Sequence, residues 1–205
     1  MNLFEKLKKV AGMDQASLDK ESTLNQYQIL DDDPIDVVFA KTLIQNNGIF
    51  FYCDTQNALV KTIEGIIKKL NTEMIYCNEV ALQKLLLSSH VQFEDSNYSK
   101  CHLTLSSCEY LIANQAKIML SSKQLKSNNI KNLPQEHVVI AYTSQIVRNL
   151  NEAMSGINTR YIDNLPSTIT TITSKQDSNS KSEGNVKKLS VVLIEDFKSK
   201  KQIIT

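Results

Sequence analysis

Short apolar runs alternate with helical apolar stripes over residues 35–88, and this alternation constrains the fold more than any other feature of the sequence. The runs cover residues 49–53 and 74–77, and apolar residues recur every three or four positions in the segments around them. This spacing is typical of a parallel sheet with helices packed on its faces. The stripes are Ile35, Val38, Phe39, Leu43 and Ile44, then Leu59, Ile63, Ile66, Ile67 and Leu70, then Val80, Leu82, Leu85, Leu86 and Leu87.

Three more apolar runs lie between residues 100 and 149, and each ends in a pair of hydroxyl residues. Runs of this length, rich in Val, Ile, Leu and Tyr, predict buried strands. The predicted fold class is therefore α/β, with three layers and a mostly parallel sheet. The strands expected after residue 88 are 91–93, 102–105, 116–120, 138–142, 169–173 and 189–194. The helical segments expected there are 110–113, at most one turn, and 145–154.

The first 32 residues differ in pattern from the rest of the chain. Residues 2–10 form a predicted amphipathic helix, and the polar stretch after it is expected to be a flexible tether. The helix docks either on its own domain or on a partner. We therefore expect two parts, residues 1–32 and an α/β domain at 33–205 with a polar tail; Asp33 is expected to cap the first domain helix. The helical stripe consists of Leu3, Phe4, Leu7 and Val10.

Composition narrows the class of function. The net charge of +1 gives no basic surface for nucleic acid. No run of 18 apolar residues predicts a membrane span, and the first residues lack a signal-peptide core, so a cytoplasmic protein is expected. Cys53, Cys77, Cys101 and Cys108 lack the spacing of an iron–sulfur or zinc site. We expect no cofactor, no bound metal and four small buried thiols.

A ligand site in such a sheet is expected at the carboxyl ends of the strands. Polar residues follow several of the predicted strands, and each of them could contact a ligand or cap a helix instead. Glu109 could serve the site or be a surface carboxylate at a helix start. The three histidines are weak candidates, because none has an evident carboxylate or thiol partner. The candidate ligand contacts of the expected pocket are Ser106, Ser107, Glu109, Asn114, Lys117, Thr143, Ser144, Ser174 and Lys175.

The polar segment at residues 174–188 separates the last two predicted strands. Val186 is its one apolar residue, so we expect a mobile loop. Such a loop is either a lid over a site or a remnant.

Residues 106–118, SSCEYLIANQAKI, resemble the LUD-domain signature T-G-A-D-x-A-I-A-E-T-G-T-L. Leu133-Pro134-x-x-His137 and the strands at 169–173 and 189–193 continue the resemblance, which covers about residues 34–196. It identifies the chain as similar to the lactate utilisation protein C family, with a domain like the NagB/RpiA/CoA-transferase fold. The resemblance implies a subunit that works with iron–sulfur oxidoreductase partners to oxidise L-lactate to pyruvate, and a small organic acid as a ligand.

The chain departs from this signature where chemistry is expected. Asn114 replaces a glutamate, Ala116 replaces a glycine and Lys117 follows them, whereas Ser106 and Glu109 are similar to the family's residues. An amide cannot accept a proton as a carboxylate does. We therefore expect a degenerate site in which Glu109 pairs with Lys117, within an accessory subunit. Two alternatives are a non-catalytic binding or regulatory module on the same fold and an independent enzyme acting on a CoA thioester or sugar phosphate.

Overall fold

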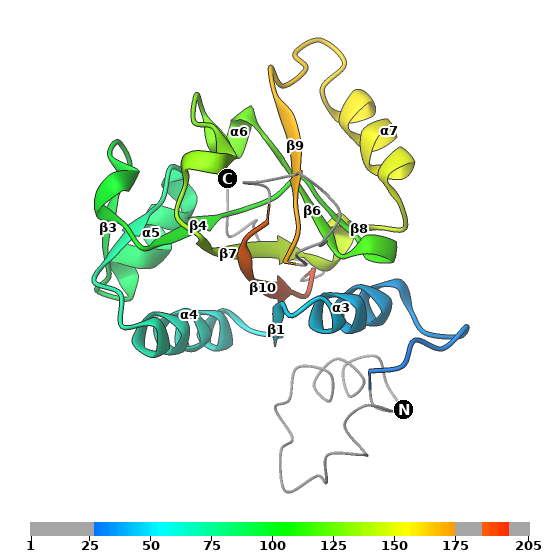
Figure 1. The fold of residues 1–205 in the computed structure, drawn as a ribbon, viewed down its shortest axis with the longest axis horizontal. Helices are drawn as coiled ribbons and strands as arrows, with labels where there is room; N and C mark the ends of the chain where they lie inside the picture. Colours follow the sequence, from blue (N-terminus) through cyan, green and yellow to red (C-terminus); the bar gives the residue numbers. More distant parts are fainter. Residues whose placement is uncertain (1–26, 175–185, 197–205) are drawn as a thin grey trace, which may run out of the picture.

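The computed structural model describes residues 27–174 and 186–196 (Figure 1). The predicted helix at 2–10, most of the predicted tether, Lys175 and the centre of the polar segment, and residues 197–205 lie outside the described residues. Among the helices in the described parts of the chain, none is long and apolar enough to cross a membrane.

Six strands form an all-parallel sheet in the order β1-β10-β7-β4-β2-β3, which confirms the predicted fold class. The longest strands of this main sheet are the neighbours β10 and β7, with seven residues in each strand. Both strands are almost continuous apolar runs because both faces of the sheet are covered. The bounds are β1 Ile49–Cys53, β2 Met74–Tyr76, β3 Gln92–Glu94, β4 Leu103–Ser106, β7 Glu136–Tyr142 and β10 Lys188–Ile194.

Three helices accompany the first strands of the main sheet: α3 (Ile35–Gln45), α4 (Gln56–Leu70) and α5 (Val80–Ser88). The side chain of Thr55 caps α4 by accepting a hydrogen bond from the Ala58 amide at 3.2 Å. The predicted cap at Asp33 is wrong. Its carboxylate instead forms a 2.5 Å salt bridge with Lys41, whose buried ammonium group requires a charged partner.

A second sheet of four strands, β8-β5-β6-β9, lies against the main sheet. In it, β5 and β6 form an antiparallel hairpin, with Tyr110 opposite Met119. The predicted helical turn at 110–113 is therefore largely a strand, and the predicted helix at 145–154 starts later, as α7 (Leu150–Arg160). The remaining bounds are β5 Tyr110–Ile112, β6 Lys117–Ser121, β8 Ile146–Val147, β9 Ile169–Ile172, α6 Ser122–Leu125, η1 Tyr98–Lys100, η2 Ala113–Gln115, η3 Ile130–Asn132 and η4 Thr143–Gln145.

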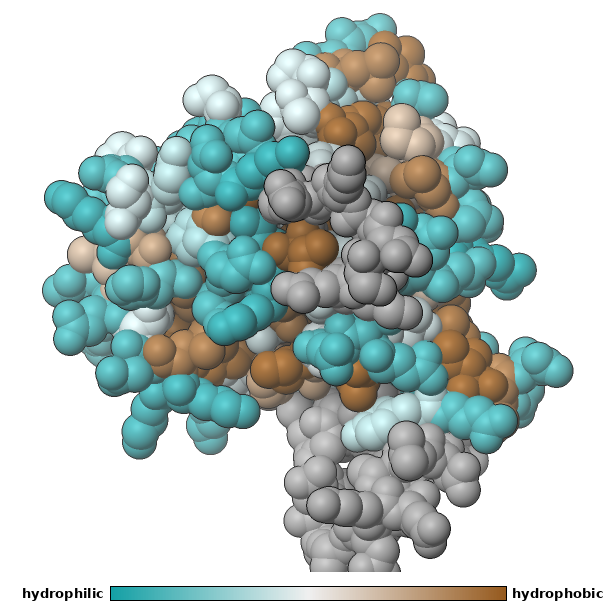
Figure 2. Space-filling model, in the orientation of Figure 1, coloured by the Kyte–Doolittle hydropathy of each residue, from teal (hydrophilic) through white to brown (hydrophobic). Residues whose placement is uncertain are grey.

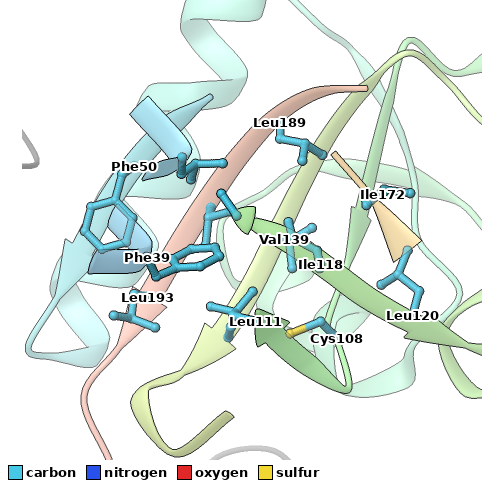
Figure 3. Packing of buried hydrophobic residues seen from close by; sticks show 14 of the residues in the cluster. Phe39, Phe50, Cys108, Leu111, Ile118, Leu120, Val139, Ile172, Leu189 and Leu193 are labelled. Carbon is cyan, nitrogen blue, oxygen red and sulfur yellow. The ribbon is translucent and has the colours of Figure 1, made fainter. Parts of the chain in front are cut away.

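The core consists of three apolar layers. The largest lies between the two sheets and is closed by α3, with Phe39, Ile118 and Val139 packed together (Figure 3). A second layer lies on the other face of the main sheet under α4 and α5. The third packs the outer face of β5 and β6 against α7. The side chains of β6 alternate between the layers, since Ile118 faces the first layer and Met119 the third.

The end of the polar segment at 174–188 pairs with neighbouring strands and is not a loop. Val186 forms a parallel bridge with Thr173, and Lys187 is buried with its ammonium group bonded to the Leu133 carbonyl at 2.9 Å. The prediction of a loop is therefore wrong for residues 186–188. It is not tested for residues 175–185, which lie outside the described residues.

Candidate functional site

The carboxyl ends of the main-sheet strands meet at one edge, and a connected set of polar side chains lies there. The residues after β2, β4, β7 and β10 all contribute to it. Parallel strands place these ends together, as the sequence predicts. The set consists of Glu79, Ser107, Glu109, Ser121, Gln124, Thr143, Ser144, Gln145, Arg160, Tyr161 and Asp196.

Glu109 is the centre of this set and is 1% exposed. Its carboxylate accepts hydrogen bonds from Ser121 Oγ at 2.7 Å, Arg160 at 3.0 Å and Tyr161 Oη at 3.1 Å. Gln124 Nε2 adds a longer bond of 3.3 Å. A buried carboxylate is tolerated when it is paired and fully hydrogen-bonded, and Glu109 meets both conditions. The interpretation as a surface carboxylate at a helix start is therefore wrong.

Arg160 reaches Glu109 from the last turn of α7. Gly156 lets α7 approach β5 closely, because a Cβ there would overlap the hydroxyl of Tyr110. That hydroxyl accepts a 3.1 Å bond from Arg160, whose guanidinium carbon lies 4.9 Å from the Tyr110 ring centre. The packing of α7 on β5 thus positions the arginine for the carboxylate.

Glu79 and Ser107 form the neighbouring unit. The Glu79 carboxylate accepts the Ser107 amide at 2.7 Å and also the Ser107 hydroxyl. Gln124 Nε2 lies 3.5 Å from the same hydroxyl, so it joins the two units. Burial raises the pKa of Glu79, and the charge of Glu109 adds to the increase.

Ser106 points the other way, into the layer between the sheets. Its hydroxyl lies 2.8 Å from His137 Nε2, and both side chains are buried. Burial lowers the pKa of His137 to about 3, and the charge of Lys187 acts in the same direction. The ring is therefore neutral near pH 7, and sequence reasoning undervalued it because its partner is a hydroxyl.

Thr143 and Ser144 lie at the same edge, where Asp196 holds them. The Asp196 carboxylate accepts the Thr143 hydroxyl at 2.7 Å, the Ser144 amide at 2.6 Å and the Ser144 hydroxyl at 2.9 Å. Gln145 links this turn to the centre by donating to the Cys108 carbonyl at 2.6 Å.

Asn114, Lys117 and Ser174 form a separate group beside the end of α3. Asn46, which follows α3, contacts two residues of this region: its Nδ2 donates to the Gln115 carbonyl at 3.3 Å, and its own carbonyl accepts the Ser174 hydroxyl at 2.8 Å. Asn114 is exposed and Lys117 half-buried. The predicted pair of Glu109 and Lys117 is wrong, because the partner of Glu109 is Arg160.

A family comparison can now be set against this geometry. The family model described as "LUD domain" matches residues 37–194. The chain belongs to the LUD domain family.

One solved structure shares the fold of this LUD domain: the crystal structure of a DUF162 family protein from Deinococcus radiodurans at 1.70 Å resolution. The TM-score is 0.59 and the identity 14%, and the match covers 79% of this chain and 96% of that chain. At this identity the likeness shows the fold alone. No curated protein gives a significant match to the sequence.

In this LUD domain the nine predicted site residues fall into groups with different surroundings. Ser107, Glu109, Thr143 and Ser144 share the strand-end edge, Ser106 is internal, and the other three described residues lie beside α3. Their role as ligand contacts stays a prediction. Lys175 lies outside the described residues.

Among the residues that the structure describes, hollows of about 530 and 430 Å³ lie away from the strand-end edge. The larger follows the outer face of α7, and the smaller lies between β9 and the segment from α6 to η3. Over residues 27–174 and 186–196, no group of three or more histidine, cysteine or acidic side chains is placed to hold a metal ion.

Proposed function

We propose that this protein is a cytoplasmic accessory subunit for the oxidation of L-lactate to pyruvate, acting with iron–sulfur partner proteins that carry the redox centres. Membership of the LUD domain family supports this role, since LUD domains are associated with lactate utilisation proteins. The four cysteines, all buried and unpaired, suit a reducing compartment. The subunit contributes binding and assembly rather than its own chemistry.

The observation that carries this proposal is the internal pairing of Glu109. A general base or nucleophilic carboxylate needs a lone pair directed at the substrate. The Glu109 carboxylate is instead bonded to four protein donors and is almost completely buried. The Ser107 hydroxyl is held by Glu79 in the same way. These contacts support a strand-end edge that stabilises the fold instead of catalysing a reaction.

Reconstitution tests the proposal. The purified protein is expected to be colourless and free of iron, and to form no pyruvate from L-lactate with an artificial electron acceptor. Added to purified iron–sulfur oxidoreductase subunits from the same organism, it is expected to raise their rate of lactate oxidation.

Two variants distinguish assembly from catalysis in that assay. Ser107→Ala and Asn114→Ala are expected to leave the stimulated rate unchanged within about twofold, because neither side chain meets substrate. Circular dichroism confirms that both variants are folded. Turnover by the protein alone, or a loss of more than about tenfold in folded Ser107→Ala, contradicts the accessory role.

The same closed edge also supports the alternative of a binding or regulatory module without a redox partner. Calorimetric titration with L-lactate and pyruvate separates the two proposals. Binding without any stimulation of the iron–sulfur subunits favours the module, and stimulation favours the accessory subunit.

A further inference from the structure

The outer face of α7 is a continuous stripe without charge. Six residues at helical spacing, uncharged in every case, line the larger hollow of about 530 Å³. They recur at intervals of three and four, so they form one face of the helix. The stripe consists of Asn151, Met154, Ser155, Asn158, Thr159 and Ile162.

A solvated helix of this domain looks different. The exposed face of α4 carries Lys61, Glu64, Lys68 and Lys69, whose charged groups favour water. The charged residues of α7 do not belong to the stripe and bind other parts of the domain. Glu152 accepts the Arg148 amide at 2.8 Å and Arg160 pairs with Glu109. The uncharged stripe on α7 is therefore a face suited to a covering segment.

Large apolar side chains at both ends of α7 extend this face. Leu150 is 46% exposed, Ile162 75% and Leu165 55%. Figure 2 shows hydrophobic surface at the top right of the molecule, over α7 and the loop that follows it. Clustered exposed apolar groups of this kind mark binding surfaces, because water solvates them poorly.

We propose that residues 2–10 of this same chain dock on the uncharged face of α7. Their sequence places Leu3, Phe4, Leu7 and Val10 on one helical stripe and Lys6, Lys8 and Lys9 off it. Such a helix buries its apolar edge in an uncharged hollow and leaves its lysines in water.

The chain length outside the described domain permits this contact. Tyr27 is anchored to α3, where its carbonyl accepts Gln45 Nε2 at 2.9 Å. The 16 residues 11–26 connect Tyr27 to the segment and span up to about 50 Å when extended. A domain of this size is roughly 40 Å across, so the segment reaches α7 from its anchor.

Hydrogen exchange on the full chain tests the docking. An isolated helix shorter than about 12 residues is marginal in water, so slow exchange of amides 2–10 requires a docking surface. Ile162→Asp places a charge in the hollow at an exposed position that the fold tolerates. It is expected to accelerate the exchange of amides 2–10 by about tenfold. Leu87→Asp on α5, where Leu87 is 62% exposed, is the matched control and is expected to leave that exchange unchanged.

The reciprocal variants act on the segment itself. Leu7→Asp is expected to accelerate exchange at 2–10 and to expose the outer face of α7 to hydroxyl-radical labelling, whereas Lys9→Asp on the opposite helical face changes neither. Rapid exchange of amides 2–10 in the wild-type chain overturns the proposal. So does a dimer in sedimentation that Ile162→Asp dissociates while exchange at 2–10 stays the same, because the occupant is then a second copy.

Discussion

Two halves of one short segment, residues 106–109 and 114–117, are treated very differently by the fold. Glu109 in the first half is buried and bonded to four side chains, and Ser106 and Ser107 each have a polar partner. Asn114 in the second half is exposed, and Lys117 makes no salt bridge within the described residues. The halves are separated by the strand β5, of three residues, and by Ala113.

This difference shows where substitution is tolerated in the segment. The first half places ionisable and hydroxyl groups in the core, so each must keep its partners. In the second half Asn114 and Gln115 are exposed and Lys117 is half-buried, and the backbone carries the structural role. Ala116 adopts a left-handed conformation with φ 46°, which the β5–β6 hairpin requires. The replacement of the signature's glutamate by Asn114 and of its second glycine by Ala116 falls in this second half.

The largest expected effect comes from removing the partner of Glu109. Arg160→Met leaves a buried carboxylate without its cation and is expected to lower the free energy of unfolding by about 2–3 kcal/mol. The loss is smaller than for a fully buried pair because the Arg160 side chain is 42% exposed. Urea unfolding at pH 7 measures it.

Arg148→Met is the matched control, since Arg148 is exposed, and it is expected to change stability by less than about 0.5 kcal/mol. A double-mutant cycle with Glu109→Gln isolates the pair. Equal losses in the two methionine variants would show that the stability of the fold depends on the Arg160–Glu109 pair no more than on an exposed arginine.

The second largest effect concerns His137, the partner of Ser106, and is measured as the pH dependence of the free energy of unfolding. The pKa of His137 is lowered to about 3 by burial, against about 6.5 in the unfolded chain. Below pH 6.5 the unfolded chain therefore binds a proton that the folded chain does not, and stability falls as the pH falls toward 3. The slope is about 1.4 kcal/mol per pH unit, or roughly 2 kcal/mol between pH 6 and 4.5.

His137→Gln keeps a polar atom for Ser106 and removes this titration. Unfolding curves at several pH values give the slope of the unfolding free energy against pH. In the variant this slope is expected to be smaller by the contribution of one proton. His102→Gln, at an exposed position, is expected to keep the wild-type slope. A parallel pH dependence in all three proteins contradicts a buried neutral His137.

The main sheet could be predicted from sequence because its strands are apolar runs bounded by helices. The residues 49–53 predicted as a strand are those of β1. In the second sheet, β6 and β9 correspond to the strands predicted at 116–120 and 169–173. The other two strands could not be predicted, because β5 has three residues and β8 two. Ile146 and Val147 also continue, by spacing, the stripe of α7 that starts at Leu150, so a strand and a helix were merged.

Part of the site could be predicted as well, because some of its residues follow predicted strands. Ser107 and Glu109 follow a recognisable strand, so their place at the sheet edge follows from topology. Their partners come from far along the chain. Glu79 is 28 residues from Ser107 and Arg160 is 51 residues from Glu109, and no local spacing indicates either contact. Gly156 was the one available signal, since it marks the close approach of α7 to Tyr110.

A smaller effect separates backbone from side chain in the second half. Ala113 and Ala116 are both fully buried, but Ala116 has a left-handed backbone. Replacing either with glycine removes a buried methyl and adds unfolded-state entropy, while at Ala116 it also relieves strain of about 1–2 kcal/mol. Ala113→Gly is expected to destabilise by about 1.5 kcal/mol and Ala116→Gly by less than about 0.5 kcal/mol. Thermal unfolding of the two variants measures the difference; equal losses mean that the turn stores no strain.

The smallest expected effect belongs to Lys117. Its neighbour across the hairpin is Ile112, and its ammonium group has no carboxylate partner among the residues the structure describes. Lys117→Ala is therefore expected to change the free energy of unfolding by less than about 0.5 kcal/mol. In a double-mutant cycle with Glu109→Gln the coupling energy of Lys117 is expected to be zero within error, against more than about 1 kcal/mol for Arg160 in the same cycle. A coupling to Lys117 as large as that to Arg160 would place the lysine beside the carboxylate and join the two halves into one site. Zero coupling means that the two halves are energetically independent and that the cation paired with Glu109 is Arg160 of α7.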